Sequence, residues 1–284
     1  MVREQLIAAH GWDADAIILI PVVASGDRIQ DRALAEVGGK ALWTKELDTA
    51  LLAGEIDLAV HSMKDVETVR PDALAIAAML PRADVRDRLV GATSIDSLPQ
   101  RARFGTSAPR RRAQVLRLRP DLEITLMRGN VQTRLAKLAR GDVDATLLAA
   151  AGLDRLEMHD IGTAISAELL LPAPAQGAIG IEILTDNRCM HDWLGAINCG
   201  STFSCVSSER ALLSGLAGDC RSPVAALAAI KGNMISLRAK IYAPDGDHVE
   251  CGEALFKPGS DSPAALGRSM LARAHSSIRA VFQA

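Results

Sequence analysis

The sequence has few aromatic residues, no long apolar run and almost no net charge. Aromatic side chains make up 3% of the 284 residues, so Ala, Val, Leu and Ile must form most of the core. The longest apolar run near the start covers residues 17–23, which is too short to cross a membrane and lacks the flanks of a signal peptide. The net charge of −2 by itself indicates no polyanionic partner. We therefore expect a cytoplasmic protein with no membrane partner.

The cysteines form no CxxC pair. There are five of them, at positions 189, 199, 205, 220 and 251. An odd number of cysteines in a reducing compartment predicts free thiols. The pattern does not indicate a metal site, and we expect none.

Apolar periodicity predicts helices alternating with strands over most of the chain. Helices are predicted at 2–10, 40–53 and 130–140, and strands at 17–23, 56–61, 122–127 and 143–148. This alternation implies parallel sheets. The junction Gly54-Glu-Ile-Asp57 is echoed by Gly141-Asp-Val-Asp144, which hints at two domains of one type.

The last third of the chain has a different pattern. Strands are predicted at 222–230, 234–243 and 247–256, and a final helix at about 263–281. The turn sequences Lys231-Gly-Asn233 and Pro244-Asp-Gly246 join these strands. Short turns imply antiparallel pairing, so we expect a small α+β domain with a three-stranded antiparallel sheet after the two α/β domains.

Basic residues concentrate between 101 and 140. This segment holds ten arginines and Lys137 against only Asp121 and Glu123, a local balance of +9. A solvated basic helix face and an anion-binding site both explain such a composition.

The placement of the arginines favours an anion site. Arg110 and Arg111 fall in the first turn of a helix predicted to begin near Pro109, while Arg128 and Arg134 frame the start of the next helix. A cation at a helix N-terminus opposes the helix dipole by roughly 0.3–1 kcal/mol. A bound anion at each N-terminus offsets that cost, and ligands of open α/β sheets lie at this edge.

Carboxylate, phosphate and nucleic acid are the candidate anions. The sequence contains no GxxxxGK[ST] motif. Phe104 is the only aromatic residue in the basic segment, so base stacking has little support and we expect no nucleic-acid partner. Small carboxylates remain, and the guanidinium fork suits them.

Asp65 follows the strand predicted at 56–61, at the end where functional loops gather. In an arginine-rich cleft its carboxylate stays ionised, and it can stabilise a cationic intermediate or hold an ammonium group. Gly38-Gly39-Lys40 precedes the helix predicted at 40–53. This triplet fits a flexible hinge and a close backbone approach to an anion equally well.

Seven motifs together resemble the porphobilinogen deaminase (hydroxymethylbilane synthase) family. They are VGGKALWTKEL at 37–47, HSMKD at 61–65, GTSAPRR at 105–111, MRGNVQTRLAKL at 127–138, LAAAGLDRL at 148–156, LPAPAQGAIGIE at 171–182 and GDCRSP at 218–223. Their order and approximate spacing are those of the family. The resemblance implies two doubly wound domains, similar to periplasmic binding proteins, around a cleft. Those domains would be 1–80 with 177–197 and 84–171, followed by a cofactor-carrying domain at 199–284.

The resemblance also implies a reaction and a site. Four porphobilinogen molecules would be condensed head to tail into hydroxymethylbilane with release of ammonia, in haem biosynthesis, by a monomer. A dipyrromethane cofactor would be held by a thioether to Cys220, and Asp65 would be the catalytic carboxylate. The implied cofactor contacts are Lys64, Thr106, Ser107, Arg110 and Arg111, and the implied substrate contacts are Lys40, Arg128, Arg134, Arg155 and Gln176.

Three features depart from the family pattern. The family begins with a strand followed by Arg-x-Ser-x-Leu-Ala, whereas this chain begins in the next helix, so we expect weakened folding, cofactor loading and activity. Ala108-Pro109 replaces the usual Ser-Leu, and GDCRSP at 218–223 replaces the more usual Gly-Gly-Cys. The alternatives are an inactive or mis-started deaminase, a non-catalytic two-lobed carboxylate-binding protein, and an RNA-binding protein.

Overall fold

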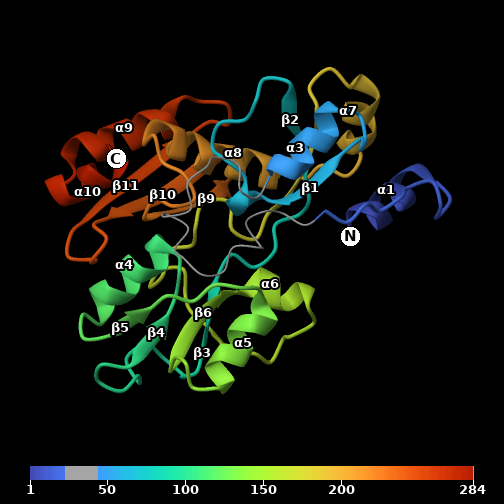
Figure 1. Cartoon of the computed structure of the whole chain (residues 1–284). Coiled ribbons are helices and arrows are strands. Elements are labelled where there is room, and N and C mark those ends of the chain that lie inside the picture. The colour runs from blue at the N-terminus through green and yellow to red at the C-terminus, as the bar shows by residue number, and fades with distance from the viewer. Residues whose placement is uncertain (23–43, 284) are drawn as a thin grey trace.

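The computed structural model describes residues 1–22 and 44–283 and arranges them around three sheets. Figure 1 shows two lobes: the lower lobe, largely green, contains the five-stranded sheet, and the upper lobe contains the two three-stranded sheets. Each sheet has its own buried core, and we name the three parts of the chain the first, second and third units.

The first unit contains a sheet of order β1-β8-β2. Its strands are β1 (Ala59–Ser62), β2 (Leu74–Met79) and β8 (Ile179–Leu184), and its helices are α1 (Val2–His10), α3 (Lys45–Leu52) and α7 (Arg188–Gly195). Both strand pairs are antiparallel. The expected parallel pairing is therefore wrong for this sheet, because β8 returns from the other lobe and inserts between β1 and β2 in the opposite direction.

The sequence predictions for the start of the chain have mixed outcomes. The helix at 2–10 is confirmed, and α3 confirms the described part of the helix at 40–53. The predicted strand at 17–23 is wrong over 17–22, which contains no strand, and Ile18 is 82% exposed. An apolar run forms a buried strand only if it finds a pairing partner, and β8 pairs with β1 and β2 instead.

The second unit contains a mixed sheet of order β5-β4-β6-β3-β7. Its strands are β3 (Asp87–Val90), β4 (Arg103–Gly105), β5 (Glu123–Thr125), β6 (Ala145–Ala149) and β7 (Thr163–Ala164), and its helices are α4 (Pro109–Leu118), α5 (Val131–Ala139) and α6 (Ala150–Arg155). β4 pairs in parallel with β5 and β6, as predicted, whereas β3 is antiparallel to its neighbours. The carboxyl ends of β4, β5 and β6 lead into α4, α5 and α6, so three helix N-termini meet at one edge of the sheet.

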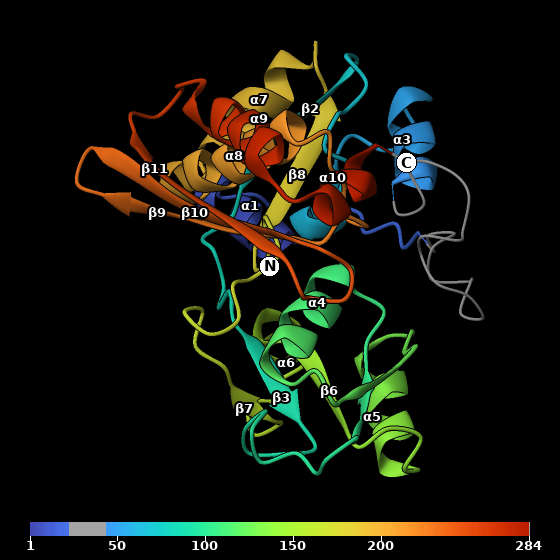
Figure 2. The same ribbon diagram turned by 90° about the vertical axis from the view of Figure 1, so that its left-hand side faces the viewer.

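The third unit has the predicted antiparallel sheet, of order β11-β10-β9. Its elements are β9 (Val224–Lys231), β10 (Met234–Tyr242), β11 (Val249–Phe256), α8 (Gly200–Gly215), α9 (Ser262–Arg273) and α10 (Ser276–Phe282). The single final helix predicted at 263–281 is wrong, because Ala274 and His275 are extended and break it into α9 and α10. Figure 2 shows α4 of the lower lobe directly below this sheet.

A buried carboxylate in α8 holds both segments that join the lobes. Arg82 donates to Glu209 Oε1 at 2.8 Å and to Oε2 at 2.9 Å, and the backbone N–H of Ala175 donates to Oε2 at 2.6 Å. The backbone N–H of Ala228 in β9 donates to Oε1 at 2.7 Å. Glu209 thus joins the predicted linkers near 81–84 and 171–177 to the third unit. The exact domain boundaries stay a prediction.

We expect Glu209→Gln to lower the free energy of unfolding by about 3 kcal/mol. The amide nitrogen would face the N–H donors that the carboxylate accepts, and Arg82 would lose its buried counter-charge. The measurement is urea unfolding followed by circular dichroism. The matched control is Glu168→Gln, which breaks an exposed ion pair with Arg238 and should cost less than about 1 kcal/mol. Equal losses in the two variants would contradict the role of Glu209.

Candidate functional site

A cavity of about 350 Å³ lies where the three units meet. Its walls come from the loop after β1, from the N-termini of α4 and α5, from the second linker and from the turn before β9. Its charged and polar lining consists of Lys64, Asp65, Ser107, Arg110, Arg111, Asn130, Arg134, Gln176, Asp219, Cys220 and Ser222.

Most of the predicted site residues meet in this cavity. Those that line it are Lys64, Asp65, Ser107, Arg110, Arg111, Arg134, Gln176 and Cys220. Thr106 and Arg128 are buried just outside the lining, and Arg155 is exposed at the end of α6. Lys40 lies outside the described residues.

Asp65 is the last residue of η2 (Met63–Asp65), a turn of 3₁₀ helix that follows β1. The buried Met63 fixes the turn by donating its N–H to Ala178 O at 3.0 Å. On the other side, Arg210 of α8 donates to the carbonyls of Val66 at 3.1 Å and of Thr68 at 3.2 Å. The catalytic candidate is therefore held from both the first and the third units.

At the N-terminus of α4, where a bound anion is predicted, the arginines contact a carboxylate of the protein itself. The fully buried Asp87 accepts from Arg110 Nη2 at 2.8 Å and from Arg111 Nη2 at 2.7 Å. Gln176 Nε2 donates to the same carboxylate at 3.0 Å. Each arginine also donates to a backbone carbonyl, of Leu171 and Leu147 respectively. A guanidinium carries five N–H donors, so these bonds use only some of the donors of each arginine.

Asp87 is the functional residue that sequence reasoning missed. It lies among Asp84, Arg86 and Arg88, and no spacing distinguishes it from these neighbours. Burial acts to raise the pKa of Asp87, but Arg110 and Arg111 outweigh burial and hold that pKa well below its usual range. The carboxylate is therefore ionised at neutral pH and balances one of two adjacent positive charges.

The remaining cations of the cavity repel one another. Burial, followed by the charge of Arg111, lowers the pKa of Arg134 to about 10, although Asp65 opposes the shift. Burial also lowers the pKa of Lys64. Asp65 and Asp87 oppose this shift, and Arg111 and Arg134 add to it. A bound anion would relieve this repulsion, so the cavity is electrostatically suited to carboxylate ligands.

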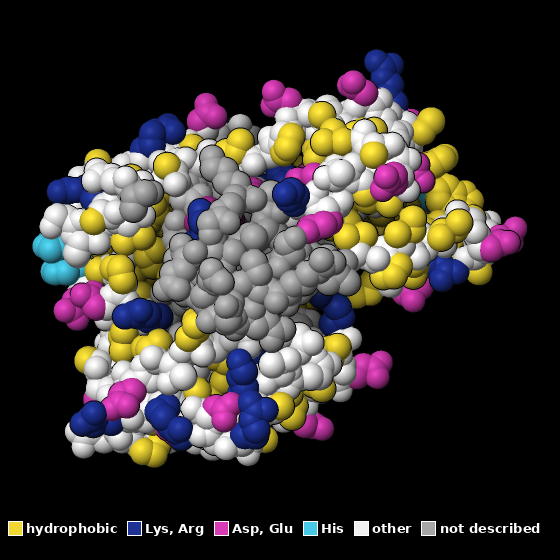
Figure 3. All heavy atoms as spheres, viewed as in Figure 1, with side chains coloured by type: hydrophobic (Ala, Val, Ile, Leu, Met, Phe, Trp, Pro, Cys, Tyr) yellow, Lys and Arg dark blue, Asp and Glu magenta, His cyan; other side chains and the backbone are white. Residues whose placement is uncertain are grey.

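Four other arginines of the basic segment form ion pairs outside the cavity. Their partners are acidic residues within and just beyond the segment, in the pairs Arg101–Glu123, Arg103–Asp144, Arg119–Asp121 and Arg140–Asp142. In the face shown in Figure 3, basic and acidic side chains are interspersed over the lower lobe. The basic segment thus contains four arginines in ion pairs, the exposed Arg112 and Arg117, and a buried group at the cavity.

Cys220 is exposed in the turn between α8 and β9. All five cysteines are free thiols, as predicted. Although solvent reaches Cys220, protein surrounds its thiol on most sides. This burial, followed by the charges of Asp219 and Asp65, raises the pKa of the thiol to about 12. Cys220 and Asp65 are therefore within electrostatic reach of each other across the cavity.

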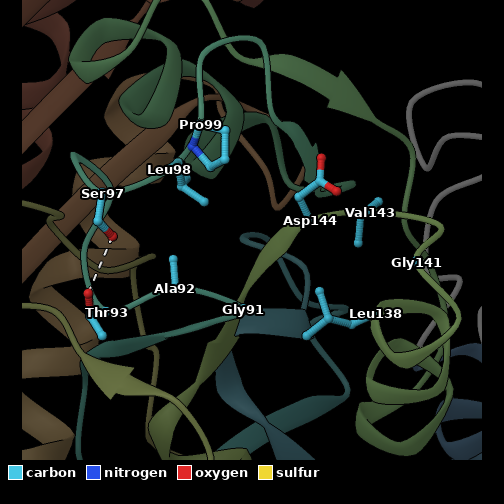
Figure 4. Close-up of a pocket in the computed structure, with 10 residues that line it drawn as sticks. All are labelled: Gly91, Ala92, Thr93, Ser97, Leu98, Pro99, Leu138, Gly141, Val143 and Asp144. Atoms are coloured by element: carbon cyan, nitrogen blue, oxygen red, sulfur yellow. Dashed lines mark hydrogen bonds between the residues drawn. The ribbon is translucent and has the colours of Figure 1, made fainter.

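A second hollow, of about 640 Å³, is shown in Figure 4. It lies near Asp144, at the amino end of β6, whereas the first cavity is lined by Leu148 and Ala149 at the carboxyl end. Asp144, the one charged residue in its lining, is paired with Arg103 at 2.7 Å. The hollow contains none of the predicted site residues, eight of which line the first cavity.

Two family models together match most of the chain. The model described as porphobilinogen deaminase, dipyromethane cofactor binding domain, matches residues 1–192. The model described as porphobilinogen deaminase, C-terminal domain, matches residues 203–274. The chain belongs to the porphobilinogen deaminase family. This confirms the family predicted from the seven motifs, and with it the enzyme class and the dipyrromethane cofactor.

Curated relatives agree with the family models. The porphobilinogen deaminase of Sphingopyxis alaskensis is 57% identical over 289 residues, which cover 99% of this chain and 91% of the relative. That of Paracoccus denitrificans is 47% identical over 271 residues, which cover 94% of this chain and 85% of the relative. Among solved structures, the periplasmic VFT2 domain of Bordetella pertussis BvgS matches 74% of this chain and 78% of that chain, at 17% identity and a TM-score of 0.38. So distant a likeness adds nothing to the assignment.

The cavity fits the cofactor of porphobilinogen deaminases. Dipyrromethane has two pyrrole rings with two carboxylates each and is attached through a thioether, so it requires cations and an accessible thiol. Cys220 provides the thiol, and Lys64, Arg110, Arg111 and Arg134 provide the cations. In the described part of the chain, no three His, Cys, Asp or Glu side chains cluster as metal ligands, and no helix is long and apolar enough to span a membrane.

The raised pKa predicts slow alkylation of Cys220 in protein prepared without cofactor. Because the thiolate is the reactive form, the rate with iodoacetamide should rise about tenfold per pH unit between about pH 7 and pH 9. Cys199 is the internal control, because hydrogen bonds with Ser201 and Thr202 lower the pKa of its thiol. Peptide mass mapping measures both rates. Faster alkylation of Cys220 than of Cys199 at neutral pH would contradict the prediction.

Proposed function

We propose that this chain condenses four porphobilinogen molecules head to tail into hydroxymethylbilane, with release of ammonia at each addition, in the cavity between the lobes. The observation that carries the proposal is that one cavity brings a carboxylate, a thiol and a group of cations together. These residues are Asp65, Cys220, Lys64, Arg110, Arg111 and Arg134. A non-catalytic carboxylate-binding protein would need the cations but neither the thiol nor the carboxylate.

Asp65 is the proposed catalytic carboxylate. Departure of ammonia from the aminomethyl group of porphobilinogen leaves positive charge on the methylene carbon and the pyrrole ring. A carboxylate placed beside that ring stabilises the charge as it develops. The turn of η2 and the anchoring of the next residues by Arg210 keep Asp65 in place during the reaction.

The cations are proposed to bind the acetate and propionate groups of the substrate and of the cofactor. Charge-assisted bonds from arginine to carboxylate are short and strong. Asp87 fixes Arg110 and Arg111 before any ligand arrives, so less conformational entropy is lost on binding. When attached to Cys220, dipyrromethane supplies the free pyrrole position at which the chain is extended.

The other predicted assignments are carried forward as proposals. Arg128 and Arg155 are proposed to contact the substrate, Thr106 the cofactor site, and Lys40 the same cleft. Thr106 acts indirectly, because its Oγ1 accepts from the N–H of Ala108 at 3.2 Å at the start of α4. We also propose a cytoplasmic monomer without a nucleic-acid partner, and the domain division 1–80 with 177–197, 84–171 and 199–284.

We expect Asp65→Asn to abolish turnover without unfolding the protein, because the amide keeps the shape but not the charge of the side chain. The assay measures hydroxymethylbilane and ammonia, and the wild-type protein should release one ammonia for each porphobilinogen consumed. Asp57→Asn, an exposed substitution in the same unit, is the control and should retain full activity. Normal bilane formation by folded Asp65→Asn would refute the assignment.

We expect Arg110→Ala and Arg134→Ala each to lower kcat/KM by roughly 10- to 150-fold, the equivalent of about 1.5–3 kcal/mol for a charge-assisted hydrogen bond. Steady-state kinetics gives the ratio, and native gels show whether partly elongated enzyme accumulates. Arg112→Ala is the matched control, since Arg112 lies next to Arg111 on α4 but is exposed. A loss of the same size in Arg112→Ala would mean that the overall positive charge of the protein, and not the placement of an arginine in the cavity, determines the change in kcat/KM.

A further inference from the structure

The side chain of Asp219 closes the turn that carries Cys220. The N–H of Ser222 donates to the carbonyl of Asp219 at 3.1 Å, which places Cys220 and Arg221 at the centre of a four-residue turn. The Asp219 carboxylate accepts from the backbone N–H of Arg221 at 2.8 Å. An aspartate at the first position of a turn stabilises it through this bond.

Asp219 also binds the side chain of Arg221. The guanidinium donates to Asp219 Oδ2 from Nε at 2.9 Å and from Nη2 at 2.7 Å. The carboxylate thus holds both the backbone and the side chain of the residue after Cys220. Before the turn, Thr68 Oγ1 donates to the carbonyl of Gly218 at 2.8 Å, which ties the turn to the loop after Asp65.

We propose that Asp219 is a positioning residue for cofactor attachment: its carboxylate fixes the turn that presents the Cys220 thiol to the cavity and to Asp65. The inference rests on the proposed function. The Asp219 side chain forms these bonds from the position directly before the thiol. This chain therefore restricts the attachment turn with a side chain, and Asp219 lines the same cavity as the thiol.

The step affected is the formation of one C–S bond. Sγ of Cys220 bonds to the aminomethyl carbon of porphobilinogen, the C–N bond breaks, and ammonia leaves with the proton of the thiol. A turn that is already fixed loses less conformational freedom as the bond forms. The negative charge of Asp219 acts in the other direction, because it disfavours the thiolate. Substitutions at 219 separate the two effects.

The test follows cofactor loading of protein purified from cells that make no porphobilinogen. Porphobilinogen is added, samples are quenched in acid, and intact mass gives the fraction that carries two or more pyrrole units, because loaded protein can be elongated further. Asp219→Ala removes the turn bond, the charge and the bonds to the Arg221 guanidinium. Asp219→Asn keeps an oxygen acceptor for the N–H of Arg221, and it loses the charge and the two bonds from the guanidinium to Oδ2. Asp219→Ser keeps a weaker acceptor, and Cys220→Ser is the blank.

We expect Asp219→Ala to load about tenfold more slowly than the wild type, Asp219→Asn to load at least as fast as the wild type, and Asp219→Ser to lie between them. If Asp219→Ala does not fold, the test is the order of the loading rates of Asp219→Asn, Asp219→Ser and the wild type. The proposal would be overturned if Asp219→Ala loaded at the wild-type rate. It would also be overturned if Asp219→Asn loaded as slowly as Asp219→Ala or Asp219→Ser. A wild type that gains no adduct and forms no bilane would instead refute the proposed function.

Discussion

The cavity depends on the burial of one carboxylate between two arginines. Adjacent guanidinium groups on a single helix turn repel each other, and their burial is costly without a counter-charge. Asp87 provides that charge from the first residue of β3 and is fully buried. Because it accepts from Arg110, Arg111 and Gln176 at once, it fixes α4 and the second linker relative to the sheet. The walls of the cavity are thereby set before a ligand binds.

The same use of buried charge extends to the third unit. Glu209 holds both linkers to α8, and Arg210, the next residue, holds the loop after Asp65. One turn of α8 therefore holds both linkers between the lobes and the loop that follows Asp65, the catalytic candidate. Thr68 continues this chain of contacts to the turn that carries Cys220. The carboxylate, the thiol and the arginines come from different units. These polar contacts fix the positions of the units relative to one another.

The features that depend on local sequence patterns were predictable from the sequence. Turn residues and alternation predicted β9, β10 and β11, and the placement of the arginines pointed to the N-termini of α4 and α5, which line the first cavity. Long-range pairing was not predictable in this way. The antiparallel insertion of β8 depends on a strand that returns from the other lobe, and no local signal shows that the carboxylate between the arginines is Asp87. The helix dipoles predicted a bound anion at the arginines of α4, whereas the carboxylate that the structure places there belongs to the protein.

We propose that this cavity holds a covalent dipyrromethane on Cys220. Peptide mass mapping of the purified protein, with each of the five cysteines followed separately, tests this attachment. We expect an added mass of two pyrrole units on the peptide that contains Cys220, and its loss in Cys220→Ser. An unmodified Cys220 in a protein that forms hydroxymethylbilane, or the adduct on another cysteine, would contradict it.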